Sequence, residues 1–109
     1  MAIANRRERE RHAINSVRAL LDETRLALVS SLLQKPRYIS DLAKTVNSDR
    51  ATVSYHLNIL EGNGLVESRY IMLQDPGLKG KVGRVYTVNR TQLKKALDAV
   101  QQRLARLET

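Results

Sequence analysis

The chain has 109 residues, 42% of them hydrophobic, which is enough for one small domain with an aliphatic core. It contains no cysteine, so disulfides, thiolate metal sites and thiol nucleophiles are excluded, and no apolar run is long enough to cross a membrane. Its net charge of +8 predicts a polyanionic partner. The start of the sequence lacks the apolar stretch of a signal peptide, so we expect an intracellular, cytoplasmic protein.

Two helices are expected first. The segment 6–21 has a helical apolar face formed by Ala13, Ile14, Val17, Leu20 and Leu21. Asp22 is a suitable cap for a second helix over 23–34, and Lys35-Pro36 ends it. The apolar residues of this second helix are dense enough for the centre of a core.

Two shorter helices follow, joined by a tight turn. Ser40 is expected to open the first, over 41–46, and Asn47-Ser48 to form the connection. Ser48 or Asp49 then caps a helix over 49–61, which Gly62 and Gly64 terminate. Two short helices in this arrangement predict a helix-turn-helix motif.

The hydrophobic period changes from helical to alternating after Gly64. Segments 65–73 and 84–88 are predicted strands, and the loop 74–83 between them holds three glycines and a proline. A hairpin directly after the second helix of the motif makes it winged, with 74–84 as a basic wing. A last helix, capped by Thr91, is expected to reach about Leu107.

The helix over 49–61 has two unlike faces. Val53, Leu57 and Leu60 fall on one side and predict burial, whereas the opposite side has small and hydrogen-bonding residues: Ala51, Ser54, Tyr55 and Asn58. A helix that enters the major groove needs such a face, without acids and with groups that reach base edges. An ordinary solvated face is the alternative interpretation.

The stretch "ISDLAKTVNSDRATVSYHLNILEGNGLVESR" resembles the winged helix-turn-helix of the ArsR/SmtB family of prokaryotic repressors. The family's pattern is matched by Thr52, Val53, Ser54, His56, Leu57, Leu60, Gly64, Leu65 and Val66. The resemblance covers about 21–88, and the flanking helices match in position only. It implies one domain over 1–109, made of an N-terminal helix (1–21), a winged-helix core (22–88) and a C-terminal dimerisation helix (89–109).

We therefore expect double-stranded DNA as a partner, contacted by the outer face of helix 49–61 and by the wing. The expected DNA-binding residues are Arg50, Ala51, Thr52, Ser54, Tyr55, Asn58, Lys79, Lys81 and Arg84. The last helix has apolar residues at coiled-coil spacing, and the family dimerises through its terminal helices. The expected homodimer interface is Ile14, Val17, Leu21, Leu93, Leu97, Val100, Leu104 and Leu107.

The sequence departs from the family where many members bind metals. The segment "YISDLAK" has no cysteine, and the last helix has Asp98 and Glu108 but no histidine. We therefore expect neither metal nor cofactor, and the sequence does not identify an effector. His56 is expected to pack at the edge of the core and His12 to be solvated; no catalytic constellation is present, so an enzyme is not expected.

The fold prediction is mainly α with a β-hairpin wing, and the functional prediction is a dimeric, sequence-specific regulator, nucleoid-associated and acting as a repressor on a pseudo-palindromic site. Two alternatives stay open at this point. One is a weakly specific architectural DNA-binding protein of the same fold. The other is a winged-helix module that binds an acidic protein.

Overall fold

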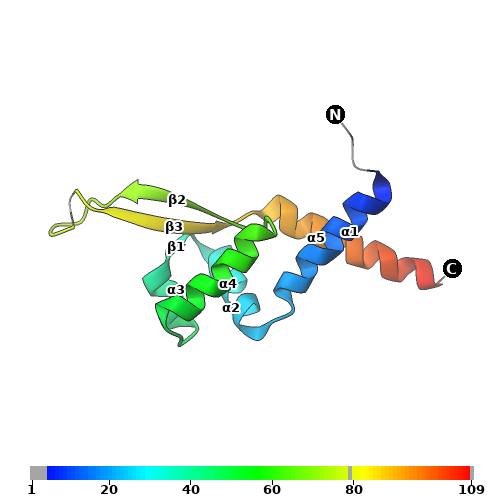
Figure 1. The fold of residues 1–109 in the computed structure, drawn as a ribbon, viewed down its shortest axis with the longest axis horizontal. Helices are drawn as coiled ribbons and strands as arrows, with labels where there is room; N and C mark the ends of the chain where they lie inside the picture. The colour runs from blue at the N-terminus through cyan, green and yellow to red at the C-terminus, as the bar shows by residue number, and fades with distance from the viewer. Residues whose placement is uncertain (1–4, 79, 109) are drawn as a thin grey trace.

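A helical body lies at the centre of the molecule, and the hairpin and the terminal helices extend from it in opposite directions (Figure 1). This computed structural model describes residues 5–78 and 80–108 and measures 61 × 36 × 22 Å. In chain order its elements are α1 (Arg6–Leu20), α2 (Glu23–Gln34), β1 (Arg37–Tyr38), α3 (Ile39–Thr45), α4 (Arg50–Gly62), β2 (Val66–Met72), β3 (Val82–Val88), α5 (Arg90–Ala105) and a 3₁₀ turn η1 (Arg106–Glu108).

The longer helices all begin at an Asn or Asp whose side chain accepts a hydrogen bond from the backbone N–H three residues later. The caps are Asn5, Asp22, Asp49 and Asn89. Each satisfies one of the amides that a helix start leaves unpaired. The cap predicted at Thr91 is therefore wrong, because Asn89 begins α5 two residues earlier.

The short helix α3 begins differently from the prediction. It starts at Ile39, and its cap residue Tyr38 makes no side-chain hydrogen bond. Ser40 lies inside the first turn and does not open the helix. The preceding residues Arg37 and Tyr38 form the short strand β1, which the sequence analysis did not predict.

The sheet has three antiparallel strands in the order β1-β3-β2. β2 and β3 pair along their whole length, from Val66 opposite Val88 to Met72 opposite Val82. The second strand of the hairpin thus begins at Val82, two residues before the prediction, and the loop is shorter. β1 adds Arg37 and Tyr38 to the other edge of β3 and joins the sheet to the start of α3.

The core lies between α2, α3, α4 and the base of the hairpin. Its most completely buried side chains are aliphatic: Leu28, Leu42, Leu57, Leu60, Leu65, Val53 and Val66. Burying one such side chain contributes roughly 1.5–3 kcal/mol. This core fixes the position of α4, on which the candidate site depends.

The turn between α3 and α4 contains a left-handed residue. Asn47 has φ +52°, a region that Asn tolerates better than other residues with a Cβ atom. The backbone N–H of the next residue, Ser48, returns to the carbonyl of Ala43 at 3.0 Å. The turn therefore ends α3 with its last carbonyls bonded and starts α4 within a few residues.

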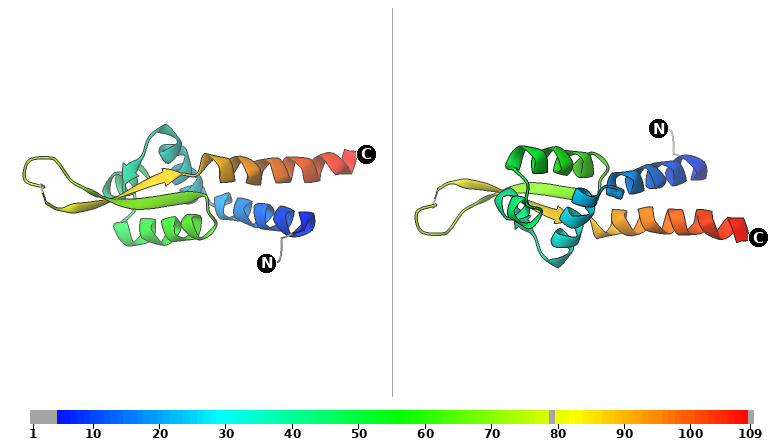
Figure 2. Two further views of the ribbon diagram at one scale, coloured as in Figure 1. Left: turned by 90° about the horizontal axis from the view of Figure 1, so that it is seen from above. Right: turned by 90° about the horizontal axis from the view of Figure 1, so that it is seen from below.

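The terminal helices α1 and α5 cross in projection in Figure 1 and lie side by side in both views of Figure 2. Glu10 joins them, since its carboxylate accepts hydrogen bonds from Arg103 Nη1 (3.3 Å) and Arg106 Nη2 (2.7 Å). The Arg106 hydrogen bond is the largest cause that holds the pKa of Glu10 below its ordinary value. Within residues 5–78 and 80–108, no helix is long and apolar enough to cross a membrane.

Candidate nucleic-acid interface

One face of α4 packs into the core as predicted. Val53, Leu57 and Leu60 have no exposed surface, and they share the core with residues of α2 and α3. The position and rotation of α4 are therefore set by close packing, which tolerates little displacement. The opposite face of α4 must consequently point outward.

The outer face of α4 brings together the residues predicted to contact DNA. Five of them are exposed and Ser54 is half-buried; the exposed ones are Arg50, Ala51, Thr52, Tyr55 and Asn58. The Tyr55 side chain, 61% exposed, has its hydroxyl available as both donor and acceptor. The one acid of α4, Glu61, lies in its last turn. This surface has the donors, acceptors and lack of negative charge that a major groove requires.

The first turn of α4 contains Thr52, one of the expected DNA-binding residues. Its backbone N–H donates to Asp49 Oδ1 at 2.7 Å. This bond, followed by one from the Thr52 hydroxyl, keeps the pKa of Asp49 below its ordinary value. Asp49 thus already occupies the amide that a phosphate oxygen would use.

His56 lies at the edge of the core and holds α4 against α2. Its Nδ1 is 3.0 Å from Arg25 Nη1 and 3.9 Å from Asp22 Oδ1, and its side chain is 13% exposed. Arg25 Nε also donates to the carbonyl of Ala19, in the last turn of α1. His56 therefore connects elements of the body, in agreement with its interpretation as a packing residue.

The wing positions its predicted basic residues in different ways. Lys81 is exposed at the end of the loop. Lys79 lies outside the described residues. Arg84, predicted at the wing tip, lies instead inside β3, where it donates hydrogen bonds to Ser68 Oγ at 2.9 Å and Glu61 Oε1 at 3.1 Å. This role of Arg84 does not follow from local sequence patterns, because both partners are 16 or more residues away along the chain.

The predicted dimer residues fall into two groups. Leu21, Leu97, Leu104 and Leu107 are strongly exposed in the single chain, and Ile14, Val17 and Val100 are half-buried. Leu93 packs against the chain's own core. The exposed leucines Leu97 and Leu104 of α5, with Leu107 in the following turn η1, continue the line begun by Leu93 and are called the leucine stripe of α5.

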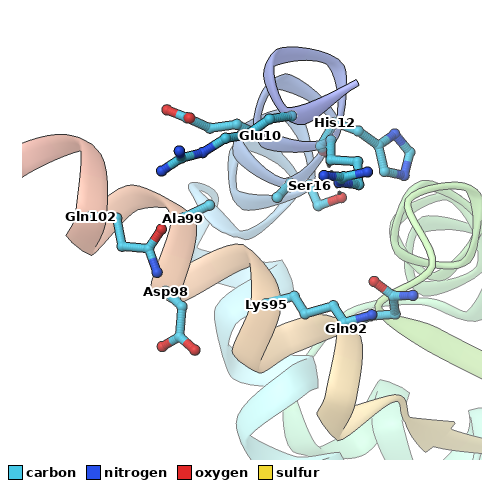
Figure 3. A pocket seen from close by; sticks show the side chains of 11 residues that line it. Glu10, His12, Ser16, Gln92, Lys95, Asp98, Ala99 and Gln102 are labelled. Atoms are coloured by element: carbon cyan, nitrogen blue, oxygen red, sulfur yellow. Dashed lines mark hydrogen bonds between the residues drawn. The ribbon is translucent and has the colours of Figure 1, made fainter. Parts of the chain in front are cut away.

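A hollow of about 570 Å³ lies between α1 and α5 (Figure 3). Its lining mixes charges, with Lys95 and Asp98 from α5 and Glu10 from α1, and has the small residues Ala99 and Ser16 between them. Among the described residues, no group of three His, Cys, Asp or Glu side chains could hold a metal ion.

The fold and its exposed face define a winged helix-turn-helix protein. Residues 22–68 match the sequence model of the bacterial regulatory proteins of the arsR family, which confirms the predicted resemblance over the helix-turn-helix and the start of the wing. No curated protein sequence gives a significant match.

Solved structures of similar fold cover most of the chain. An ArsR-like transcriptional regulator from Rhodococcus sp. RHA1 is 28% identical, with a TM-score of 0.70 over 88% of this chain and 83% of that one. A homodimeric winged helix-turn-helix DNA-binding domain from Mycobacterium bovis is 23% identical, with a TM-score of 0.63 over 96% and 90%. Reduced HlyU from Vibrio cholerae is 23% identical, with a TM-score of 0.65 over 90% and 93%.

Proposed function

We propose that the protein is a sequence-specific, double-stranded-DNA-binding transcriptional regulator that acts as a dimeric repressor in the cytoplasm, at the nucleoid. The observation that supports this most is the exposed, acid-free outer face of α4, opposite a face that is wholly buried. We call α4 the recognition helix from here on. Two recognition helices of a dimer would enter successive major grooves about 34 Å apart on a pseudo-palindromic site.

Roles follow from the chemistry of each side chain. Arg50 and Tyr55 are proposed to reach base edges, together with Ser54 and Asn58, while Ala51 touches a thymine methyl group. The wing lysines, Lys79 and Lys81, are proposed to meet phosphates. Thr52 is proposed to do so as well, by exchanging its hydrogen bonds to Asp49 for bonds to a phosphate oxygen. Arg84 has intramolecular partners that compete with a phosphate contact, and its role is considered below.

The dimer is proposed from the exposed leucine stripe of α5. Leu97 is 50% exposed in the single chain and Leu107 is 81% exposed. Apolar side chains at coiled-coil spacing gain free energy when a second copy covers them. The similar fold of the M. bovis domain, which is homodimeric, agrees with this proposal.

A weakly specific architectural DNA-binding protein is the second candidate, favoured by the net charge of +8 on a small chain. A module that binds an acidic protein is the third. The first two candidates bind duplex DNA and differ in sequence selectivity, whereas the third binds a protein, so one series of experiments separates them.

The test is a selection of bound duplexes from a random DNA pool, followed by affinity measurements at several salt concentrations. We expect enrichment of one two-fold-related sequence and a steep fall of affinity with salt. Salt-dependent binding without enrichment would support the architectural protein. Absence of binding to any duplex would overturn the proposal and favour the protein-binding module.

A further inference from the structure

Arg84 lies where the wing leaves the body of the protein. Alternate residues of a strand lie on the same face of a sheet. On the face of the β2–β3 hairpin that begins at the core, four cross-strand pairs therefore follow one another toward the wing tip. From the core outward they are Val66–Val88, Ser68–Tyr86, Tyr70–Arg84 and Met72–Val82. The first pair packs with the core, whereas Met72 and Val82 are exposed. Arg84 therefore belongs to the last pair on this face that contacts the helical body.

The Arg84 guanidinium is held on several sides. Its Nε donates to Ser68 Oγ at 2.9 Å, and its Nη2 donates to Glu61 Oε1 at 3.1 Å, in the last turn of the recognition helix. Its Cζ lies 5.2 Å from the ring centre of Tyr86 and 5.6 Å from that of Tyr70. A planar guanidinium can make two directed hydrogen bonds and stack on rings at once, which a lysine cannot.

We propose that the ion pair of Arg84 and Glu61, here called the brace, fixes the wing relative to the recognition helix. This inference rests on the proposed function. A two-stranded hairpin is marginally stable alone, so a wing without the brace would sample several orientations. Binding DNA through helix and wing together would then require ordering of the wing, which lowers affinity. Arg84 is thus a positioning residue for the wing and not a phosphate contact.

A substitution of Glu61 distinguishes the two roles of Arg84, because they predict opposite changes in DNA affinity. Changing Glu61 to Gln removes a negative charge near the DNA-binding face and releases Arg84. If Arg84 bound phosphate, this change would tighten DNA binding. The brace requires the opposite: Glu61→Gln should weaken binding to the selected site, on the order of three- to tenfold, although the protein becomes more positive. Asp75→Asn, which removes an acid from the wing loop, is the matched control and should not weaken binding.

Variants of Arg84 separate geometry from charge. Arg84→Lys keeps the positive charge but loses the planar guanidinium with its two directed donors, so it should weaken DNA binding about as much as Arg84→Gln. Arg69→Gln removes an arginine from the opposite face of the same hairpin and is the matched control. Lys81→Gln is the reference for a phosphate contact, since it should flatten the salt dependence by about one unit per lost contact. Arg84→Lys should leave that slope unchanged. The double variant, with both Glu61→Gln and Arg84→Gln, should bind the selected DNA no more weakly than the single variant Arg84→Gln.

A second readout needs no DNA. Backbone amide exchange in segments 69–72 and 82–84 of the full chain should be several-fold faster in Glu61→Gln and Arg84→Lys, with exchange in α2 unchanged. Arg69→Gln should leave all these rates as they are. Unchanged exchange in the two brace variants overturns the proposal, as does unchanged or tighter DNA binding by Glu61→Gln. If the unaltered protein binds no duplex, the proposed function fails, and the exchange rates alone decide whether the brace exists.

Discussion

α4 and α5 have similar amphipathic sequences but different surroundings. The apolar residues of α4 that were predicted to be buried have no exposed surface, whereas most of the leucine stripe of α5 is exposed. The polar face of α4 therefore remains available for a ligand. In α5, by contrast, the apolar face remains available. An amphipathic pattern alone thus indicates a helix but does not tell which of its faces is used for binding.

The largest expected effect tests the buried side of α4. Leu57→Ala should lower the free energy of unfolding by about 2–5 kcal/mol, because it leaves a cavity among fully buried side chains. Chemical denaturation measures this. Asn58→Ala, the next residue and on the outer face, should change the free energy by less than about 0.5 kcal/mol. An equal loss in both variants would mean that the outer face of α4 is packed and not free.

A charge in the leucine stripe tests the exposed side of α5. Leu97→Arg should raise the dissociation constant of the dimer about a hundredfold, since an apolar interface leaves the charge without a partner. Sedimentation at micromolar concentration measures this, and DNA affinity should fall with it. Gln102→Arg places the same charge in the hollow beside α1 and should leave the dimer intact. If the unaltered protein is itself a monomer at this concentration, the proposed dimer is contradicted.

The polar face of α4 is tested by DNA affinity. Tyr55→Ala or Arg50→Ala should cost about 1–3 kcal/mol on the selected site, because each removes a proposed contact to base edges. The cost on unrelated DNA should be much smaller, since phosphate contacts dominate there. Unfolding curves must first show that both variants fold. Equal losses on the two DNAs would favour an architectural protein.

The smallest effect is a pH dependence that both regions share. The amide of Thr52 holds the pKa of Asp49 below its ordinary value, and the guanidinium of Arg106 does the same for the pKa of Glu10. A lowered folded-state pKa contributes stability above the ordinary value, and this contribution is lost as the pH falls through the folded value. Melting temperatures should therefore decline below about pH 4 to 5.

Two variants check the source of that decline. Asp49→Asn keeps the helix cap but cannot titrate, and Glu10→Gln loses the ion pair between α1 and α5, so each should reduce the pH dependence. Asp49 is exposed, which keeps its share of the effect small, whereas the Glu10 side chain is half-buried beside its two arginines. A pH dependence unchanged in both variants would assign the decline to other carboxylates, such as Asp22.

Local patterns predicted most of the fold. The bounds of α2 follow from the order of capping, apolar and breaking residues, and of the two caps expected for α4, Ser48 and Asp49, the structure has Asp49. β1 was missed because two residues carry no periodicity, and its pairing with β3 depends on a distant strand. Asn89 was overlooked as a cap because Thr91, two residues later, is chemically as suitable.

The candidate site could be predicted in part. The outer face of α4 follows from helical spacing, and the residues predicted there do lie on the exposed side. The position of Arg84 did not follow, since its neighbours in sequence are a basic loop while its neighbours in space are Glu61, Ser68 and two tyrosine rings. The sequence shows that this segment is basic, but which side chains pair with its arginine depends on the tertiary structure.

The left-handed backbone at Asn47 has a consequence for how such a protein can evolve. Most side chains there would cost about 1–2 kcal/mol, and only Gly, Asn or Asp adopts this conformation readily. The angle between α3 and α4 thus depends on a residue for which few replacements are acceptable. The outer face of α4 has no such restriction, because its side chains support no core. Under the proposed function, new target sequences could therefore be acquired by substitutions on α4 alone, while the turn keeps the helix in place.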